Sequence, residues 1–247
     1  MTTVRLALAR TPPEALTKEP SPALLISYAY WKSFESNRDV VRFTNYSLDS
    51  GAYTAWTSGL VIDVEEYADH CERLIATDPQ CVEVFSLDVI GDWKATMKNT
   101  EYLWARGIPA VPVYHRDDPE DMLHVLAKEY PKISLGGAVG LRPKAKKAWM
   151  AQCFARVYPK RIHGLGVVTR DILFSLPFDS VDASSWIQGP ERFGSWVYLN
   201  GKASQTKIHY RDHKEDLVRC EVEYYMRLQN QLENYWAKDL EMVRGLE

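Results

Sequence analysis

A chain of 247 residues has room for one large α/β barrel or for two smaller domains. Its formal net charge of −3 excludes a uniformly basic nucleic-acid-binding protein, so any such contact would need a local basic patch. The four cysteines are scattered without a C-x-x-C pair, which argues against a disulfide framework, and no apolar run is long enough to span a membrane. We therefore expect a soluble, cytoplasmic protein.

Short apolar runs alternate with longer amphipathic ones after a proline-rich lead-in at residues 1–22. Eight of the short runs are rich in β-branched or aromatic residues, which is typical of buried parallel strands. These predicted strands are Leu24–Tyr30, Phe43–Leu48, Val82–Leu87, Ala110–Tyr114, Lys132–Leu135, Ile162–Leu165, Ser180–Ala183 and Trp196–Leu199. The predicted helices between them are Asp63–Ala76, Trp93–Arg106, Asp118–Tyr130 and Lys144–Val157.

This alternation predicts an α/β fold with a parallel sheet, and eight strands in this length favour closure into a single (β/α)8 barrel of the TIM type. A doubly wound open sheet is the alternative, but no G-x-G-x-x-G opens a first helix, which disfavours its dinucleotide-binding version. Residues 214–243 predict a long amphipathic C-terminal helix, which packs outside the barrel or joins two copies in a homodimer. No linker divides the chain, so residues 1–247 are expected to form one domain.

Carboxylates follow several predicted strands, where the active site of a barrel lies. Asp49, Asp88 and Asp182 stand at three such strand ends, beside glycines that allow a ligand to approach the backbone. A single aspartate there most often caps the following helix, and Asp63 and Asp118 are expected to do only that. Several at one rim must be held apart or share a proton, so together they favour a functional site.

Five motifs follow the strand ends in chain order. They are Asp49-Ser50-Gly51, Leu87-Asp88, Leu135-Gly136-Gly137-Ala138-Val139-Gly140, His163-Gly164-Leu165-Gly166 and Asp179-x-x-Asp182. Between about Phe43 and Trp186 this series resembles the tRNA-guanine transglycosylase family. It is most similar to that family's short phage- and bacterial-type relatives, the DNA-guanine transglycosylases, which place 7-deazaguanine bases in DNA.

The resemblance implies a glycosyltransferase of the pentosyltransferase class that exchanges guanine for a base such as 7-cyano-7-deazaguanine. By resemblance, Asp182 is the nucleophile that forms a covalent glycosyl–enzyme, and Asp49 is the general acid and base. Asp88 would bind the Watson–Crick edge of the base, and the backbone of Gly136 and Gly137 would bind its carbonyl or exocyclic group.

Six further residues complete the expected base-binding site. Tyr53 either stacks on the base or belongs to the core, and Ser50 and Gly51 are expected beside Asp49. A base-contacting amide of the family is replaced here by His115, whereas His163 is either structural or ligand-facing. Asp179 is expected to support Asp182, because strand alternation points the two to opposite faces. These candidates are Ser50, Gly51, Tyr53, His115, His163 and Asp179.

The stretch from Arg142 to Arg161 is basic and carries no acidic residue. Its cations are Arg142, Lys144, Lys146, Lys147, Arg156, Lys160 and Arg161. A solvated helix face is the usual explanation. Because the stretch follows the Gly136-Gly137 loop directly, we expect its cations to flank the pocket and bind phosphates.

The resemblance is incomplete in the zinc motif, since the C-x-C-x-x-C of the tRNA-acting enzymes is absent. His209, His213 and Cys220 could supply three metal ligands, but exposed histidines at the start of a charged helix are the preferred interpretation, and no cofactor is predicted. DNA is therefore expected as partner, in the host cytoplasm if a phage encodes the protein. The alternatives are queuosine-type tRNA modification, a catalytically silent nucleic-acid-binding barrel subunit, and an unrelated lyase or aldolase barrel.

Overall fold

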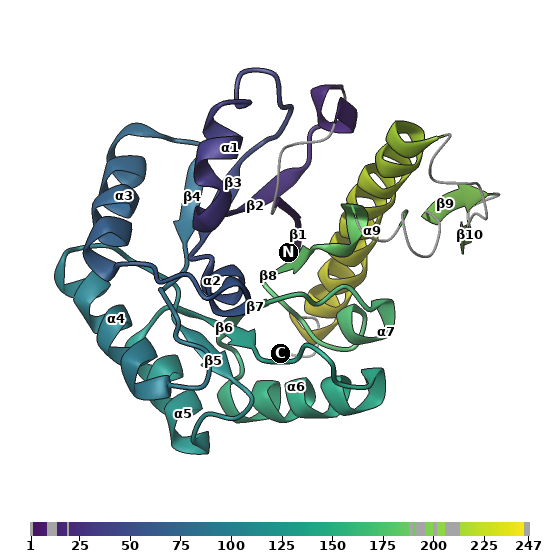
Figure 1. Cartoon of the computed structure of the whole chain (residues 1–247). Helices are drawn as coiled ribbons and strands as arrows, with labels where there is room; N and C mark the ends of the chain where they lie inside the picture. The colour runs from purple at the N-terminus through teal and green to yellow at the C-terminus, as the bar shows by residue number, and fades with distance from the viewer. Residues whose placement is uncertain are drawn as a thin grey trace.

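Eight parallel strands form one curled sheet with helices on its outer side in the computed structural model (Figure 1). The structure describes residues 2–8, 14–18, 20–187, 190, 196–199, 202–205 and 213–244. The strands of this sheet are β1 Thr3–Leu8, β2 Ala23–Ser27, β3 Tyr46–Asp49, β4 Cys81–Val84, β5 Val113–His115, β6 Lys132–Gly136, β7 Arg161–Gly164 and β8 Ser180–Ala183. The α/β class with a parallel, barrel-like sheet, predicted from strand–helix alternation, is confirmed.

The strands are ordered β4-β3-β2-β1-β8-β7-β6-β5, and the two edge strands approach each other where the sheet curls round. Phe85, just after β4, and Val111, just before β5, form an isolated parallel bridge. The Val111 N–H donates to the Val84 carbonyl at 2.9 Å, and the Ser86 N–H donates to the Val111 carbonyl at 2.9 Å. Through this bridge the edge of the sheet at β4 is in contact with the edge at β5.

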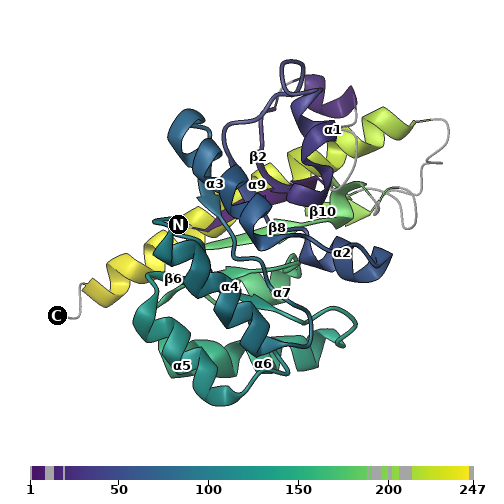
Figure 2. The same cartoon turned by 60° about the vertical axis from the view of Figure 1, so that its left-hand side comes forward.

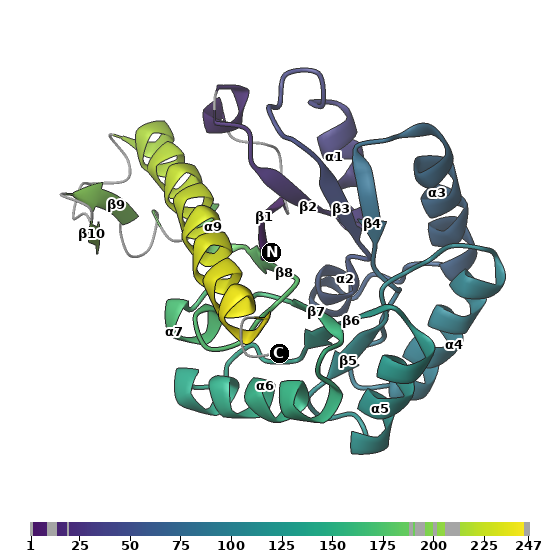
Figure 3. The ribbon, with the colours of Figure 1, turned by 180° about the vertical axis from the view of Figure 1, so that it is seen from behind.

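Most of the helices lie around the outside of the sheet, as Figures 1 and 3 show from its two ends, whereas α2 (Ala52–Ser58) lies over its middle in Figure 1. The helices are η1 Glu14–Thr17, η2 Tyr28–Tyr30, α1 Trp31–Glu35, α2 Ala52–Ser58, α3 Val64–Thr77, α4 Trp93–Ala105, α5 Glu120–Glu129, α6 Pro143–Val157, α7 Arg170–Leu173 and α9 Lys214–Arg244. None of the helices in the described ranges is long and apolar enough to cross a membrane.

Two predicted helix caps have different outcomes. The Asp63 carboxylate accepts hydrogen bonds from the backbone N–H groups of Glu65 and Glu66, so its capping role is confirmed. The prediction for Asp118 is wrong, because Pro119 occupies the cap position of α5. The Asp118 carboxylate instead accepts the His115 N–H at 2.8 Å and closes the turn after β5.

The first strand of the sheet lies in the segment that the sequence predicted to be a proline-rich lead-in. β1 runs between β2 and β8, and its outward-facing residues Val4, Leu6 and Leu8 are buried under the helices. Arg5 alternates to the inside of the sheet, where it donates to the Asn45 side chain at 2.8 Å. This inward charge interrupts the apolar run, which is why the strand was not predicted.

The predicted eighth strand is correct as a strand but wrong as a member of the barrel. Trp196–Leu199 forms β9, which pairs antiparallel with β10 (Lys202–Gln205) in a separate hairpin. Figure 1 shows this hairpin apart from the curled sheet, beyond α9. An apolar and aromatic run of four residues is compatible with either arrangement, and only its pairing partner decides between them.

The C-terminal helix α9 packs against the outside of the sheet next to β1, where Figure 3 shows it from behind. The Gln229 side chain accepts the Val4 N–H at 2.9 Å, and Glu215 accepts the Ala15 N–H at 2.7 Å. Farther along, the Trp236 indole N–H donates to the Leu173 carbonyl at 3.2 Å. The helix thereby covers the segment that begins the sheet.

We predict that Leu6→Ala lowers the free energy of unfolding by about 3 kcal/mol, because it leaves a cavity at a fully buried position in the middle of the sheet. Urea denaturation followed by circular dichroism measures the change. Val61→Ala, at a position that is 95% exposed, serves as the control and should shift stability by less than about 0.5 kcal/mol. Equal effects of the two substitutions would contradict the placement of β1.

Candidate active site

Three aspartates from three strands interact at the carboxyl end of the sheet. Asp49 ends β3, Asp88 follows β4, and Asp182 lies near the end of β8. Burial raises the pKa of Asp49 to about 7, and the negative charges of Asp88 and Asp182 add to this rise. The predicted meeting of these three carboxylates is therefore present in the structure.

The motif Asp49-Ser50-Gly51 is a tight turn from β3 into α2. Gly51 has a φ of 80°, and a Cβ there would lie 2.9 Å from the Ala29 backbone nitrogen. The Gly51 N–H donates to Asp49 Oδ2 at 2.9 Å, which holds the carboxylate in place and partly offsets the rise of its pKa. In Figure 2 the N-terminus lies on the left and α2 on the right, at the end where the strands finish.

Asp88 is held by two of the residues predicted to bind the substrate. The Ser50 hydroxyl donates to Asp88 Oδ1 at 3.1 Å, and His115 Nε2 lies 3.0 Å from Asp88 Oδ2. Burial by itself lowers the pKa of His115, but the hydrogen bond and charge of Asp88, together with the charge of Asp118, outweigh it and raise the pKa overall. His115 and Asp88 thus form a nearly buried acid–base pair.

Asp182 is held through one of its two oxygens. Its Oδ1 accepts the Gly166 N–H at 2.8 Å and lies 3.3 Å from His163 Nε2. The described residues make no hydrogen bond to Oδ2. The sequence left open whether His163 is structural or ligand-facing, and the structure places it inside the sheet, fully buried, against Asp182.

Gly136, the last residue of β6, and Gly137 after it make room for His115. A Cβ on Gly136 would lie 3.0 Å from His115 Cδ2, and a Cβ on Gly137 would lie 3.1 Å from the Arg116 backbone nitrogen. Gly137 also has a φ of 72°, which favours glycine. Their small size is therefore required by the neighbouring strand, whereas their contact with a base stays a prediction.

Two exposed aromatic rings lie on α2, the helix that follows Asp49 in the chain. Tyr53 and Trp56 are 55% and 61% exposed on α2, with ring centroids 6.1 Å apart, so the alternative of a core tyrosine is wrong. Trp56 was not predicted, although its spacing of three residues from Tyr53 places both on one helix face. A hollow of about 260 Å³ beside this face is lined by, among others, Trp56, Leu60, Asp88 and Asn99.

Three residues predicted to serve the site lie at the opposite, amino end of the sheet. Asp179 precedes β8, and its carboxylate lies 2.9 Å from Lys132 Nζ and 2.8 Å from Arg161 Nε. Lys160 donates to the Tyr130 carbonyl at 2.9 Å. Asp179 is therefore wrong as a substrate-binding residue, and Lys160 and Arg161 are wrong as members of the patch beside the pocket. All three lie where a strand begins, because β7 starts at Arg161 and β8 starts at Ser180.

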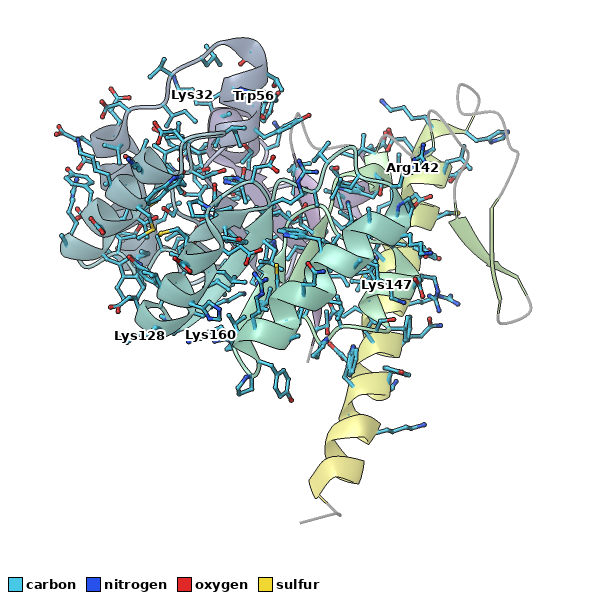
Figure 4. All side chains as sticks on the ribbon, turned by 90° about the horizontal axis from the view of Figure 1, so that it is seen from below. Lys32, Trp56, Lys128, Arg142, Lys147 and Lys160 are labelled. Atoms are coloured by element: carbon cyan, nitrogen blue, oxygen red, sulfur yellow. The ribbon has the colours of Figure 1, made fainter. Side chains whose placement is uncertain are left out.

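The first part of α6 places four of the predicted cations near the carboxyl end of the sheet, whereas Arg156 lies in the last turn of this helix and pairs with Glu120 at 2.9 Å. Figure 4 shows Arg142 and Lys160 near the two opposite ends of α6. Arg142 and Lys144 are exposed, whereas Lys147 pairs with Asp171 at 2.9 Å. Lys146 is half-buried, and burial lowers its pKa while the charge of Asp182 acts in the opposite direction.

Two of the three candidate metal ligands lie in the part of the chain that the structure describes. His213 lies just before α9, Cys220 is half-buried on its second turn, and His209 lies outside the described residues. In the part of the chain that the structure describes, no group of three His, Cys, Asp or Glu side chains is arranged to hold a metal ion.

Comparison with known proteins shows similarity only to solved structures. No protein-family model and no curated protein sequence matches this chain. A structure described as native KDPGal aligns at 10% identity with a TM-score of 0.49, covering 94% of this chain and 96% of that one. The tryptophan synthase A-subunit of Pyrococcus furiosus aligns at 13% identity with a TM-score of 0.44, covering 77% and 91%. Nothing about ligand or activity follows at this level of similarity.

We predict that Asp49→Asn removes a pH dependence of stability. Asp49 has a pKa of about 7 in the fold against an ordinary value of 3.8, so the folded chain binds more protons between these values and loses stability as pH rises. The variant should match the wild type near pH 4 and exceed its free energy of unfolding by about 2 kcal/mol at pH 8.

Urea denaturation at both pH values measures this difference. Asp121→Asn, at an exposed position on α5, is the control and should leave the pH dependence unchanged. A variant whose stability followed the wild type from pH 4 to pH 8 would show that Asp49 titrates normally.

Proposed function

We propose that the curled sheet is a (β/α)8 barrel and that the protein is a DNA-guanine transglycosylase. It would exchange guanine for a 7-deazaguanine, such as 7-cyano-7-deazaguanine, through a covalent aspartyl–glycosyl intermediate. The observation that carries this proposal is the meeting, at one end of the sheet, of Asp49, whose pKa is raised to about 7, with Asp182, one of whose oxygens accepts no hydrogen bond from the described residues.

Base exchange needs a nucleophile and a proton donor on the same glycosidic bond. Asp182 Oδ2 would attack the anomeric carbon while the bond to guanine breaks, and Asp49 would give its proton to the departing purine. The incoming base would then return a proton to Asp49 and attack the same carbon, and the ester bond to Asp182 would break. A carboxyl group with a pKa near 7 serves both proton transfers at neutral pH.

The surroundings suit a flat base with N–H groups on its edge. Asp88 can accept such hydrogen bonds, because each of its oxygens has one protein partner and a carboxylate oxygen can accept more than one. Tyr53 and Trp56 offer exposed rings for stacking on α2, the helix that follows Asp49 in the chain. A base taken from a duplex must be flipped out to reach this position.

DNA is the proposed polymer. Arg142 and Lys144 are exposed at the start of α6, next to the carboxyl end of the sheet, and are suited to contact phosphates. The choice of DNA over tRNA rests on the absence of the C-x-C-x-x-C motif from the sequence.

We predict that the wild type incorporates labelled guanine or 7-cyano-7-deazaguanine into DNA, and that Asp182→Asn reduces this by at least ~10³-fold because the nucleophile is lost. Mass spectrometry of the nucleosides measures incorporation, with tRNA as the parallel substrate. Asp121→Asn, at an exposed position on α5, is the control and should keep activity.

Each other outcome identifies an alternative. Incorporation into tRNA alone would make the protein a tRNA-guanine transglycosylase. Binding of DNA without exchange into either polymer would make it a non-catalytic nucleic-acid-binding subunit. Exchange that survives in Asp182→Asn would exclude the aspartyl–glycosyl intermediate.

We predict that Arg142→Ala and Lys144→Ala each weaken binding of a DNA oligonucleotide and lower the slope of log affinity against log salt by about 1, because each removes one phosphate contact. Lys128→Ala is the matched control, since Lys128 is exposed near the opposite end in Figure 4. Fluorescence anisotropy at several salt concentrations measures the slopes. An equal loss for Lys128→Ala would assign the contact to another face.

A further inference from the structure

A chain of buried polar groups runs inside the sheet from Asp182 towards its amino end. His163 Nε2 lies 3.3 Å from Asp182 Oδ1, and His163 Nδ1 lies 2.8 Å from Ser180 Oγ. Lys132 Nζ donates to the same Ser180 Oγ at 2.8 Å. The side chains of Lys132, Ser180 and His163 are nearly or fully buried, so water does not compete for these hydrogen bonds.

At the amino end of the sheet, the ammonium group of Lys132 decides which groups donate and which accept in this series of hydrogen bonds. It has three N–H donors and no acceptor. Its nitrogen lies 2.7 Å from Glu83 Oε1 and 2.9 Å from Asp179 Oδ2, and the third donor is directed to Ser180 Oγ. Ser180 must therefore accept from Lys132, and its own hydroxyl proton is left for another partner.

At the carboxyl end of the sheet, Asp182 decides the direction of its hydrogen bond with His163. Its Oδ1 accepts the Gly166 N–H, and because an ionised carboxylate has only acceptors, the ring nitrogen that faces Oδ1 is the donor. Burial is the largest influence on the pKa of His163 and lowers it, and Lys132 acts in the same direction, whereas Asp182 and Glu83 oppose it. In a neutral ring with its proton on Nε2, Nδ1 accepts, and the Ser180 hydroxyl is the donor within reach.

We propose that Lys132 and Ser180 hold His163 as the neutral Nε2–H tautomer, and that His163 is thereby a positioning residue for Asp182. Two donors, Gly166 N–H and His163 Nε2–H, then fix Oδ1 and turn Oδ2 towards the reacting carbon. Only this last step rests on the proposed function. The tautomer rests on the hydrogen bonds around His163 and on the complete burial of its ring.

A neutral donor suits both stages of the proposed reaction. An imidazolium would attract the Asp182 carboxylate as an opposite charge, and this attraction would make the carboxylate a weaker nucleophile. When Oδ2 carries the sugar, Oδ1 becomes an ester carbonyl oxygen that can still accept from the same two donors. The positioning contacts therefore need not change during the reaction.

The tautomer is tested by nitrogen-15 NMR of the whole protein with labelled histidine, in which the His163 signals are those that disappear in His163→Gln. Between pH 6 and pH 8 we expect Nε2 to have the shift of a protonated ring nitrogen and Nδ1 that of an unprotonated one. Ser180→Ala should disturb this pattern, and Ser180→Thr, which keeps the hydroxyl, should preserve it. An Nδ1–H tautomer or an imidazolium at pH 7 in the wild type would overturn the proposal.

The positioning role is tested by exchange kinetics. His163→Phe keeps a ring beside Phe85, whose ring centroid lies 4.7 Å away, but has no donor, and we expect kcat to fall roughly 10-fold to 100-fold with KM for DNA unchanged. His163→Gln retains an N–H donor and should recover part of the loss. His124→Phe, on the exposed side of α5, is the control. An unchanged kcat in His163→Phe would remove the positioning role.

The two levels of proposal fail separately. If the wild type exchanges no base, the proposed function is wrong, and the NMR pattern still decides the tautomer. If His163→Phe does not fold, judged by circular dichroism, Ser180→Ala provides the kinetic comparison, because it removes the hydroxyl donor and leaves the histidine in place. A Ser180→Ala enzyme with both the wild-type kcat and the wild-type NMR pattern would contradict the proposal.

Discussion

Lys132 carries a positive charge into the interior of a sheet, and the three acceptors around its ammonium group are what make that placement tolerable. Glu83 lies in β4, Ser180 lies in β8, and Asp179 is the residue before β8. The Lys132 cation on β6 therefore joins β4, β6 and β8. Removing the Lys132 ammonium group or its carboxylate partners would leave an unpaired charge in a low-dielectric interior, at a cost of several kcal/mol. The interior of the sheet is therefore organised around this contact.

Between Lys132 and the carboxyl end of the sheet lie first an apolar cluster and then the candidate site. Leu25, Phe85 and Val111 make a small apolar cluster inside the sheet, next to Ala7. The carboxylates lie beyond it, at the end where the strands finish. Aspartates in this position differ in environment, since Asp49 has a raised pKa while Asp182 is bound by Gly166 and His163. This inequality is what a reaction that needs both a proton donor and a nucleophile requires.

Most of the sheet was predictable because its strands are short apolar runs between helices with clear termini. The prediction failed where one residue faced an unusual environment. Arg5 points into the sheet, and its charge interrupts the apolar pattern by which β1 would be predicted. Trp196–Leu199 forms a strand, but its local sequence does not specify the strand with which it pairs. Tertiary contacts decided both, since an inward arginine is acceptable only with a partner such as Asn45, and a strand has a neighbour only after the chain has folded.

The same division holds for the candidate site. The sequence by itself determined that Asp49, Asp88 and Asp182 follow or end strands, because parallel strands place such ends on one side of a sheet. Only the tertiary structure separated Asp179 from Asp182, since three residues of extended chain lead from one end of the strand to the other. It alone also brought Lys132, Ser180 and His163 together. These contacts join positions up to 48 residues apart, and no local pattern records which buried polar groups will meet.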